Sequence, residues 1–284
     1  MPHCEEKLFT IGQVSKRCNI SKKTLRYYEE LGIIEPDYVC QANGYRYYKE
    51  DTMLLIPIIK YYKQMGFKLQ EMLGVTEKGS RFYHENKFVY KLDDLEEEKV
   101  QINNRYTAVD DWLNLLREGS MVLENRIDTI NIKYIDRKNY YFQEQAFNEC
   151  YQESIINIAW VNHLEKNDCA ITGPVCLEFS SAEDRMNHKA TKVCIMQEPV
   201  GRLRSGVRQK EFGGDMFLCA YHIGHPQTIM KTYKRLKDWA ISHNYEYGPS
   251  VYERYVIDYW TTKDPNEFVS EIIFPIKKRV NVND

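Results

Sequence analysis

Two acidic residues near the C-terminal end lie in segments where apolar and polar residues alternate as in β-strands. Glu253 belongs to the segment V-Y-E-R-Y-V-I-D-Y-W, and Glu271 belongs to the last strand-like segment, residues 268–276. Because successive strand side chains point to opposite faces, each acid shares a face with apolar or aromatic residues: Val251, Tyr255, Ile257 and Tyr259 beside Glu253, and Val269 and Ile273 beside Glu271. A buried carboxylate without a partner costs several kcal/mol or takes up a proton, so both acids need a partner.

Two kinds of partner would satisfy these acids. One is a cationic ligand held against aromatic rings, where each cation–π contact contributes about 0.5–2 kcal/mol. The tyrosines that could line such a pocket are Tyr140, Tyr141, Tyr221, Tyr252 and Tyr255, and each could equally belong to an ordinary core. The other is a structural salt bridge with Arg202, Arg204 or Arg254. The residues alone leave both possibilities open.

A second set of candidate residues is basic and lies near the N-terminus. Phosphates are bound by Lys, Arg, Tyr and backbone N–H groups, and base edges are read by a helix in the major groove. The net charge of −2 does not favour nucleic-acid binding by the chain as a whole, so a local patch must provide it. The candidate DNA-binding residues are Ser15, Lys16, Lys22, Lys23, Thr24, Arg26, Tyr27, Tyr45, Arg46, Tyr47 and Lys60. For Tyr28 and Tyr48 we expect a core position instead.

These basic residues lie on two short predicted helices. Thr10 with Gln13 three residues later is a capping-box pattern, and it predicts a first helix up to about Cys18. Ser21 is a favourable N-cap for a second helix, which Gly32 should end. Two short helices joined by a tight turn, with the second one basic, are typical of a helix-turn-helix.

A hairpin and a third helix are predicted next. Asn43-Gly44 between strand-forming residues predicts a hairpin with a two-residue turn, which would make the unit winged. Residues 49–73 return to a helical pattern that Gly66 should break. Pro57 should kink this helix, because it removes a backbone hydrogen bond.

A long apolar seam follows. Residues at alternating spacings of four and three form it, and all but one are apolar: Phe88, Leu92, Leu95, Lys99, Ile102, Tyr106, Val109, Leu113 and Leu116. An amphipathic helix that packs on its own domain would have the same pattern. We favour a dimerisation coiled coil, because no second helix of matching length lies nearby in the sequence. Gly119-Ser120 should end the helix.

From about residue 127 strand and helix patterns alternate. Strands at residues 138–145, 175–181, 192–199, 216–222, 250–260 and 268–276 and helices at 148–166 and 227–243 give the order β-α-β-β twice. Three residue pairs match at one constant offset: Gly173 with Gly248, Pro174 with Pro249, and Glu178 with Glu253. The order and these identities predict an internal duplication.

The composition is typical of a folded protein without membrane-spanning segments or a disulfide framework. The 284 residues are 43% hydrophobic and 28% charged, which suits two folded domains and a connector. No apolar stretch approaches the roughly 18 residues that span a bilayer, and the first residues lack a signal-peptide core, so we expect a cytoplasmic protein without membrane contact. The eight cysteines form no C-x-x-C pair and lie near no histidine at zinc-finger spacing. Free thiols are expected, with no metal and no cofactor.

Several of these segments together resemble one family. T-I-G-Q-V-S-K, S-K-K-T-L-R-Y-Y-E-E-L-G-I-I-E-P, G-Y-R-Y-Y and M-G-F-K-L-Q-E-M occur in this order between Leu8 and about Leu73, and they are similar to the DNA-binding domain of MerR-family bacterial regulators. The long helix resembles the family's antiparallel dimerisation coiled coil, and the duplicated unit resembles its GyrI-like effector-binding domain. In the multidrug-binding members a Glu after a V-Y pair meets the ligand, and Glu253 matches it. The metal-sensing branch carries cysteines where residues 75–82 have none.

The resemblance implies an α+β multidomain protein. Residues 1–76 would form a winged helix-turn-helix DNA-binding domain, residues 77–120 a dimerisation helix, and residues 121–284 the effector domain. A homodimer would bind double-stranded promoter DNA and act with RNA polymerase as an activator, by bending and untwisting a pseudo-palindromic site. A lipophilic, cationic aromatic effector would drive the change through its different affinity for two conformers.

Two other classes of function stay open at this point. Some GyrI-like domains are hydrolases, so the DNA-binding domain could be fused to an enzyme that uses Glu253 and Glu271 for acid–base work on a reactive small molecule. The C-terminal domain could instead bind a partner protein through an exposed apolar groove. We favour the non-enzymatic, ligand-responsive regulator.

Overall fold

The structure, a computed structural model, describes residues 7–73 and 81–279. They belong to two compact units, Met1–Lys99 and Val100–Asp284, which divide within one long helix. The predicted boundary between residues 76 and 77 lies outside the described residues and stays a prediction. No helix in the described ranges is both long and apolar enough to cross a membrane.

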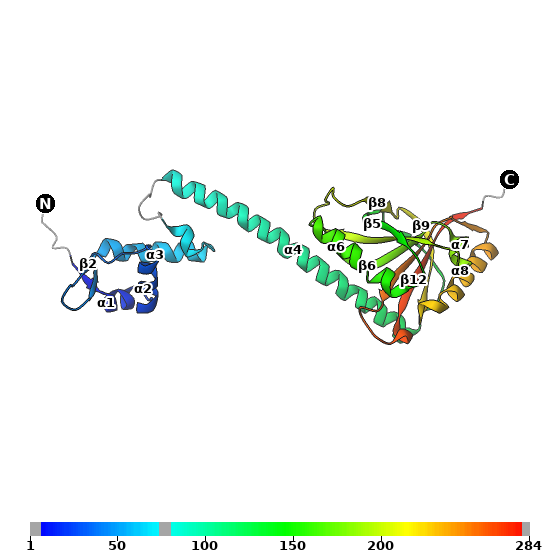
Figure 1. The fold of residues 1–284 in the computed structure, drawn as a ribbon, viewed down its shortest axis with the longest axis horizontal. Helices are drawn as coiled ribbons and strands as arrows, with labels where there is room; N and C mark the ends of the chain where they lie inside the picture. The colour runs from blue at the N-terminus through cyan, green and yellow to red at the C-terminus, as the bar shows by residue number, and fades with distance from the viewer. Residues whose placement is uncertain (1–6, 74–80, 280–284) are drawn as a thin grey trace. The chain divides into compact units, whose positions relative to one another are not determined.

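The N-terminal unit has the predicted helix-turn-helix (Figure 1). Its elements are β1 (Phe9–Thr10), α1 (Ile11–Arg17), α2 (Lys22–Glu30), β2 (Tyr38–Val39), β3 (Arg46–Tyr48), α3 (Glu50–Gln64) and the 3-10 turn η1 (Leu69–Met72). The Thr10 hydroxyl accepts from the Gln13 N–H, and the Gln13 side chain accepts from the Thr10 N–H, which confirms the capping box. Ser21 caps α2, and Gly32 follows it with a φ of +69°. The short polar side chains therefore set both helix starts.

The hairpin is present, but its turn is longer than predicted. β3 lies between β1 and β2, and the ladder ends where the Cys40 N–H donates to the Tyr45 carbonyl at 2.9 Å. Residues 41–44 therefore turn the chain, and the expected two-residue turn at Asn43-Gly44 is wrong. The Asn43 side chain accepts from the Tyr45 N–H at 3.0 Å, an Asx turn that places Asn43 and Gly44 at the end of a wider loop.

The core of the N-terminal unit contains one apolar face from each helix. Val14, Leu25 and Ile56 are buried in it, together with Tyr28 and Tyr48, so the core position expected for these two tyrosines is confirmed. The helix α3 is continuous through Pro57. It ends before Gly66, whose φ of +81° favours glycine, as predicted.

The long helix α4 (Arg81–Asn125) does not end at Gly119-Ser120, so that expectation is wrong. A Cβ at Gly119 would lie 2.3 Å from Ile257, which means that glycine here permits close packing instead of ending the helix. Leu115 and Val122 on the same stretch are buried against Val256, Ile257 and Val269. The last turns of α4 are therefore part of the C-terminal unit, past the predicted boundary at residue 120.

Upstream of this contact, the predicted seam of α4 is exposed within the single chain from Leu92 to Leu113, whereas Phe88 packs against Tyr62 and Phe67 in the N-terminal unit. Leu92 is 66% exposed, Ile102 61%, Tyr106 70% and Val109 68%. A row of large apolar side chains in water is unfavourable, and it usually marks an interaction surface. The exposure fits the predicted coiled coil and argues against packing of the seam onto its own domain.

The C-terminal unit is a curled antiparallel sheet with α6 and α8 on one face, and the end of α4 contacts residues of the other face (Figure 1). Its strands are β4 (Asn131–Ile135), β5 (Lys138–Ala146), β6 (Ala170–Phe179), β7 (Lys192–Val200), β8 (Gln209–Phe212), β9 (Asp215–Ile223), β10 (Tyr245–Tyr247), β11 (Val251–Ile257) and β12 (Val269–Lys278). Its helices are α5 (Tyr151–Ile155), α6 (Ile158–Lys166), α7 (Ala182–Met186) and α8 (Met230–Ser242), with 3-10 turns η2 (Pro226–Thr228) and η3 (Pro265–Glu267).

The strand order confirms the duplicated β-α-β-β unit. The order is β4-β9-β12-β11-β6-β7-β5-β8, and β10 pairs with β12. One copy is β5-α6-β6-β7 and the other is β9-α8-β11-β12. The equivalent strands β6 and β11 are adjacent at the centre, followed outward by β7 and β12, and then by β5 and β9. The sheet is therefore built from two similar halves that meet at β6 and β11.

The residue matches at constant offset do not describe this symmetry. Glu253 pairs across the sheet with Leu177, whereas Glu178 pairs with Tyr252, so Glu178 and Glu253 point to opposite faces. A register shift between Thr172 and Cys176 places Gly173-Pro174 inside β6, and they do not open the strand as expected. The duplication is real at the level of elements, but not at that residue offset.

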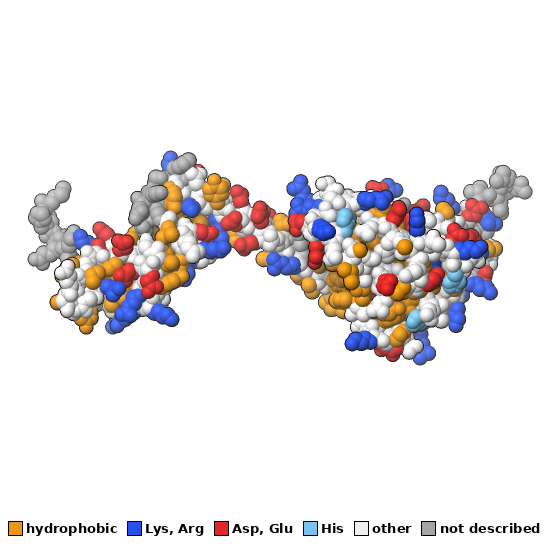
Figure 2. Space-filling model, in the orientation of Figure 1, with side chains coloured by type: hydrophobic (Ala, Val, Ile, Leu, Met, Phe, Trp, Pro, Cys, Tyr) orange, Lys and Arg blue, Asp and Glu red, His pale blue; other side chains and the backbone are white. Residues whose placement is uncertain are grey.

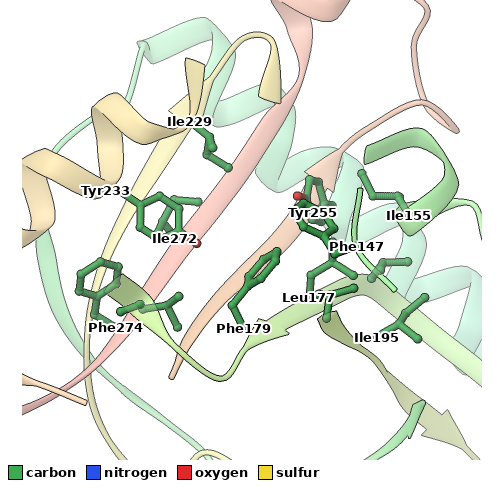
Figure 3. Packing of buried hydrophobic residues seen from close by; sticks show 14 of the residues in the cluster. Phe147, Ile155, Leu177, Phe179, Ile195, Ile229, Tyr233, Tyr255, Ile272 and Phe274 are labelled. Atoms are coloured by element: carbon green, nitrogen blue, oxygen red, sulfur yellow. The ribbon is translucent and has the colours of Figure 1, made fainter. Parts of the chain in front are cut away.

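The sheet has two distinct faces. The helix face carries α6 and α8 and includes Leu177, Ile195, Ile272 and Phe274 in the main core (Figure 3). The opposite face carries a smaller apolar cluster around Cys176, Met196, Phe217 and Ile273. Because neighbouring residues along a strand alternate between these faces, a shift of one position decides which core a side chain enters.

Candidate functional sites

Glu253 lies on the helix face and is 0% exposed. Its Oε1 accepts from Arg185 Nε at 2.8 Å and from the Tyr233 hydroxyl at 2.8 Å, and its Oε2 accepts from the Tyr255 hydroxyl at 2.5 Å. Burial, and then the charge of Glu253, hold the pKa of each of these tyrosines well above the ordinary range, so both remain hydrogen-bond donors. Both carboxylate oxygens therefore have partners within the protein.

Arg185 is also 0% exposed, and aromatic rings surround its guanidinium. The central carbon lies 4.6 Å from the ring centre of Phe179, 5.2 Å from Phe147, 5.5 Å from Tyr151 and 5.8 Å from Tyr233. Burial alone would lower the pKa of Arg185, but the Glu253 charge and hydrogen bond raise it above its ordinary value. The group therefore stays cationic inside an apolar core.

We call this arrangement the Glu253 cage: Glu253 with Phe147, Tyr151, Phe179, Tyr233 and Tyr255. The rings of Phe147, Phe179, Tyr233 and Tyr255 lie on one face of the sheet in Figure 3. A carboxylate together with several ring faces is the chemistry that binds an organic cation. In this structure the cation that the cage holds is the guanidinium of Arg185.

The short helix α7 positions Arg185. The Ser181 hydroxyl caps α7, and the Ala182 N–H donates to the Pro249 carbonyl at 2.6 Å, directly before β11. Glu183 accepts from Lys237 of α8 at 3.0 Å and from the Tyr247 hydroxyl at 2.7 Å. These contacts hold α7 over the edge of the cage, so that the Arg185 side chain extends inward.

Glu271 does not join Glu253. It pairs across the sheet with Arg254 and Tyr221, so its carboxylate lies on the opposite face. Lys133 contacts its Oε1, and Arg254 Nη1 donates to its Oε2 at 3.0 Å. The expected pair of acids in one pocket is therefore wrong, and so is the acid–base pair of a hydrolase, because the sheet separates the two carboxylates.

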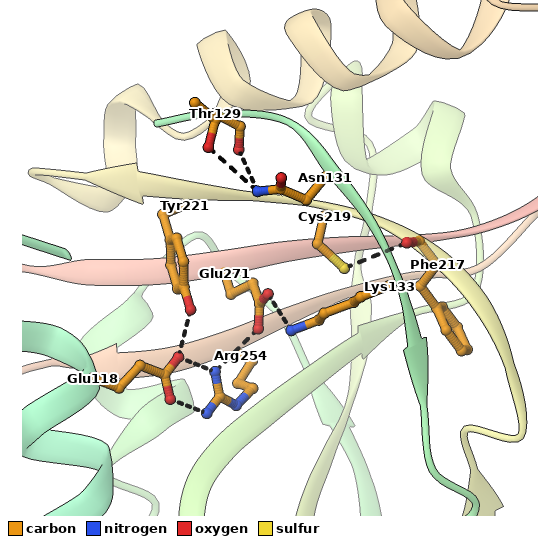
Figure 4. A network of polar contacts seen from close by, with 9 residues as sticks. All are labelled: Glu118, Thr129, Asn131, Lys133, Phe217, Cys219, Tyr221, Arg254 and Glu271. Carbon is orange, nitrogen blue, oxygen red and sulfur yellow. Dashed lines mark hydrogen bonds and ion pairs between the residues drawn. The ribbon is translucent and has the colours of Figure 1, made fainter. Parts of the chain in front are cut away.

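The network around Glu271 reaches α4 (Figure 4). Arg254 makes a two-pronged ion pair with Glu118 of α4, at 2.6 Å on each oxygen, and Tyr221 donates to the same carboxylate at 2.8 Å. Burial would raise the pKa of Glu118, but the Arg254 hydrogen bond and charge lower it below its usual range. The network thus fastens the end of α4 to the strands β9, β11 and β12.

The partners expected for the two acids are partly correct. Arg254 is the expected partner of Glu271. Arg204 pairs instead with the exposed Asp168, and the partner of Glu253 is Arg185, which the sequence did not indicate.

Of the predicted pocket tyrosines, the structure brings only Tyr255 to the Glu253 carboxylate. Tyr141 is buried elsewhere in the main core and accepts from the Arg204 N–H. Tyr140 and Tyr252 lie in the smaller cluster of the opposite face, and Tyr221 lies beside Glu118. These four do not join Glu253: Tyr140, Tyr221 and Tyr252 lie on the opposite face of the sheet, because adjacent strand positions enter different cores, and Tyr141 lies on the helix face but at another place in the main core.

Phe147, Tyr151, Phe179, Tyr233 and Arg185 were not predicted for the cage. Tyr233 lies on the buried side of α8, and Tyr151 on α5, so each had the pattern of an ordinary core aromatic. Arg185 lies in the short polar segment S-S-A-E-D-R-M, 68 positions before Glu253. No local pattern marks such a residue, because its burial depends on contacts made by distant strands.

Two surface clefts lie away from the cage. One of about 620 Å³ is lined by Arg126, Tyr221, His222, Lys231 and Arg235, among others, beside the end of α4. The other, of about 350 Å³, is lined by Phe142, Glu178, Cys194 and Lys210, among others, on the opposite face. Glu253 and Arg185 are both 0% exposed, so the cage is a filled interior site and not an open pocket.

The predicted DNA-binding surface is exposed along α1, α2 and the wing. Lys16, Lys22, Lys23 and Arg26 are exposed, as are Tyr27 and Tyr45. Figure 2 shows Lys and Arg side chains gathered on the edge of the N-terminal unit where α1 and α2 lie. A basic helix with an exposed wing beside it is the arrangement expected of a winged helix-turn-helix.

Other predicted contact residues already have partners inside the unit. The Ser15 hydroxyl donates to the Ile20 carbonyl at 2.7 Å, and Lys60 donates to the Cys18 and Asn19 carbonyls, so both close the turn between α1 and α2. Arg46 Nε donates to Glu29 of α2 at 2.6 Å. Thr24 shares a hydrogen bond with Ser21, and Tyr47 packs near Tyr38. A DNA role for these residues stays a prediction.

Comparison with known families explains both units. Residues 9–78 match the MerR HTH family regulatory proteins, and residues 134–277 match the GyrI-like small molecule binding domain. The two matches lie on the winged unit and on the curled sheet, in this order. The chain belongs to the MerR family. It is a ligand-responsive transcription regulator with a GyrI-like binding domain, as its sequence predicted.

Relatives of this MerR-family chain include regulators of drug export. It is 21% identical to the Multidrug-efflux transporter 2 regulator of Bacillus subtilis (strain 168), over 96% of this chain and 98% of that protein. It is 40% identical to the Multidrug-efflux transporter 1 regulator of the same organism, over 24% of each chain. Among solved structures, an EcmrR–DNA complex covers 95% of this chain with a TM-score of 0.47 and 20% sequence identity. A hydrolase from Listeria innocua covers 55% of this chain with a TM-score of 0.40 and 12% sequence identity.

The MerR-family chain has no group of three or more potential metal ligands within the ranges that the structure describes. Cys18, Cys40, Cys150, Cys169, Cys176, Cys194 and Cys219 are free thiols, and Cys4 lies outside those ranges. Burial raises the pKa of Cys194 and of Cys219 to about 12, which suppresses their thiolates.

Proposed function

We propose that this regulator is a homodimeric activator that binds promoter DNA and responds to a lipophilic cation bound at the Glu253 cage. The observation that carries the proposal is the cage itself, which stabilises a buried cation by one carboxylate and four ring faces. A cage that holds a guanidinium has the charge and the apolar walls that an organic cation needs.

The exposed seam of α4 supports the dimer. Two copies of the helix that pack antiparallel would cover Leu92, Ile102 and Val109, which otherwise face water. A dimer would present two copies of α2 to a pseudo-palindromic promoter site. Activation would then follow from DNA distortion that aligns the promoter for RNA polymerase, driven by the difference in effector affinity between two conformers.

The network at the end of α4 supports a route from the effector to the dimer. Glu253 and Arg254 are consecutive on β11, so an effector that shifted this strand at the cage would also shift the ion pair to Glu118. Because Glu118 lies on α4, the helix proposed to form the dimer is joined by an ion pair to the strand that carries Glu253.

The test compares a cation with a neutral molecule of similar shape. Calorimetric titration of the full chain with a methyltriphenylphosphonium salt should give saturable binding, whereas triphenylphosphine oxide should bind at least tenfold more weakly. In a reporter assay, transcription should rise with the cation only. Equal affinity for the two molecules, or binding of neither, contradicts the proposed effector class.

A charge-neutral variant of the cage gives the matched control. Glu253→Gln alone would leave Arg185 without its buried counter-ion, and breaking a buried ion pair typically costs about 3–5 kcal/mol, which is enough to unfold the domain. The double variant Arg185→Met with Glu253→Gln removes both charges together and should abolish cation binding while leaving DNA binding intact. Glu178→Gln, a carboxylate on the opposite face, should bind the cation as the parent does. Unchanged affinity in the double variant contradicts the site.

A further inference from the structure

We propose that Arg185 is a tethered occupant of the Glu253 cage, and that an incoming cation replaces its guanidinium instead of filling an empty pocket. The inference deepens the proposed function and rests on it, because it names what an effector must displace. Arg185 makes with the cage the contacts that an organic cation would make: an ion pair with Glu253 and ring faces on several sides. The regulator would thus carry its own competing ligand.

Burial and pairing separate Arg185 from an ordinary surface arginine. Arg204 pairs with an exposed Asp168 and is itself half-exposed, so water screens that pair. Arg185 and Glu253 are both fully buried, where desolvation is costly and is offset only by close contacts. The desolvation of Arg185 occurs inside the cage, which would be empty without this side chain. We therefore take occupancy of the cage to be the function of Arg185.

The guanidinium of Arg185 also lies close to a second, partly exposed carboxylate toward which it could rotate. While Nε contacts the interior Glu253, Nη1 lies 3.3 Å from Glu149, whose side chain is 39% exposed. His188, which follows α7 and is also exposed, lies 3.5 Å from the same carboxylate. Arg185 therefore bridges an interior acid and a surface acid. Rotation of its side chain toward Glu149 would free the inner carboxylate and the rings without moving the strands.

The tether sets the selectivity of the site. A group held on the protein competes at an effective concentration that a free ligand must exceed. The apparent affinity for a cation is therefore the intrinsic affinity multiplied by the fraction of molecules in which the cage is open. Only ligands with more ring contact than a guanidinium, or with a better fit to the carboxylate, would displace it. A small inorganic cation would not.

Chemical rescue tests the occupancy directly. Arg185→Ala should lower the melting temperature, because it leaves Glu253 buried without a counter-ion. N-ethylguanidinium at millimolar concentration should then raise the melting temperature of the variant in a saturable way, whereas the neutral N-ethylurea, of the same planar shape, should not. The parent should show no such rise. Equal behaviour with the two compounds overturns the proposal.

Two control variants isolate the cage. Arg185→Ala combined with Glu253→Gln should not be rescued, because the carboxylate that attracts the cation is gone. Arg204→Ala should show neither the loss of stability nor the rescue. If Arg185→Ala does not fold, Arg185→Lys replaces it: a lysine keeps the charge but lacks the planar fork, so N-ethylguanidinium should displace it and raise the melting temperature. No rise relative to N-ethylurea in that variant contradicts the occupancy.

The rescue also separates this inference from the proposed function. Removal of the tethered group should tighten binding of methyltriphenylphosphonium at least tenfold in Arg185→Ala relative to the parent. Rescue by N-ethylguanidinium without any phosphonium binding to either protein would support the occupancy and reject the proposed effector. Phosphonium binding of equal strength to both proteins, without rescue, would reject the occupancy and leave the effector class standing.

Discussion

At the scale of single residues, Tyr233 contributes to the Glu253 cage in two separable ways. Its ring lies 5.8 Å from the Arg185 guanidinium carbon, and its hydroxyl donates to Glu253 at 2.8 Å. Tyr233→Phe keeps the ring and removes the hydrogen bond. Because a hydrogen bond to a charged group contributes about 1.5–3 kcal/mol, urea unfolding should show a loss of that size. Tyr247→Phe, which removes a more exposed bond to Glu183, should cost less. An equal cost in both would show that the cage bond has no special strength.

Arg46 makes a second residue-scale test, in the DNA-binding unit. We expect Arg46→Ala to weaken binding to all DNA sequences similarly and to reduce the salt dependence by roughly one unit for each phosphate that Arg46 neutralises. The ion pair with Glu29 offers the control. If Arg46 only braces the wing against α2, Glu29→Gln will weaken binding as much as Arg46→Ala does, and the salt dependence will not change.

The sequence predicted residues well where their own neighbours decide the outcome. Glu253 was found because strand alternation places it among apolar residues, and the core positions of Tyr28 and Tyr48 were also expected. Arg185 could not be found, since its segment is short and polar and its burial comes from strands far away in the chain. The placement of Glu271 failed for a related reason: strand periodicity reveals that two sides exist, but not which side faces which helices.

At the scale of elements, α4 is the feature with the clearest consequence. Leu95→Asp together with Ile102→Asp should place two charges in the seam, and sedimentation should then detect monomers that no longer bind the operator. Val100→Asp with Gln101→Asp adds the same charge outside the seam of the same helix and should leave the dimer intact. A stable dimer in the seam variant would mean that these positions do not meet a partner copy.

The anchor of α4 predicts a pH dependence. The folded pKa of Glu118 is lowered, chiefly because the Arg254 contact outweighs burial, so its contribution is present above the ordinary glutamate value near 4.3 and is lost as pH falls through the lower folded value. Glu118→Gln should therefore be less stable than the parent at pH 7, by about 1–3 kcal/mol. The difference should shrink below about pH 4 in urea titrations. Glu124→Gln, an exposed position on the same helix, should show no such convergence. A difference independent of pH would contradict the assignment.

The elements themselves were largely predictable, and the exceptions have physical causes. Capping residues fixed the starts of α1 and α2, and the order of strands and helices revealed the duplication. The predicted end of α4 was wrong because a glycine often ends a helix, whereas Gly119 lies inside the helix and allows the close approach of Ile257. The wing turn was misjudged because Asn43 closes a wider loop with its side chain.

At the scale of the whole molecule, the MerR family and the two-part organisation follow from motifs that occur in order along the chain. The filled state of the Glu253 cage did not follow from them. The motifs indicated Glu253 as a position that could meet a ligand, whereas the group that occupies the cage here comes from Arg185 on the short helix α7. The same sequence features therefore identify the regulator family without revealing that the cage holds a side chain of the protein itself.

The contacts of Glu118 and Gly119 with the sheet also fix the rotation of α4 about its own axis. Each helical residue turns the chain by about 100°, so the direction of every side chain from Ile102 to Leu113 is set by where these two residues meet the sheet. One residue inserted before Glu118 would rotate the whole apolar row by that amount, whereas seven would return it almost to its original azimuth. Insertions or deletions of seven residues in this helix should therefore be tolerated, because they restore the direction of the apolar row, whereas other lengths should not.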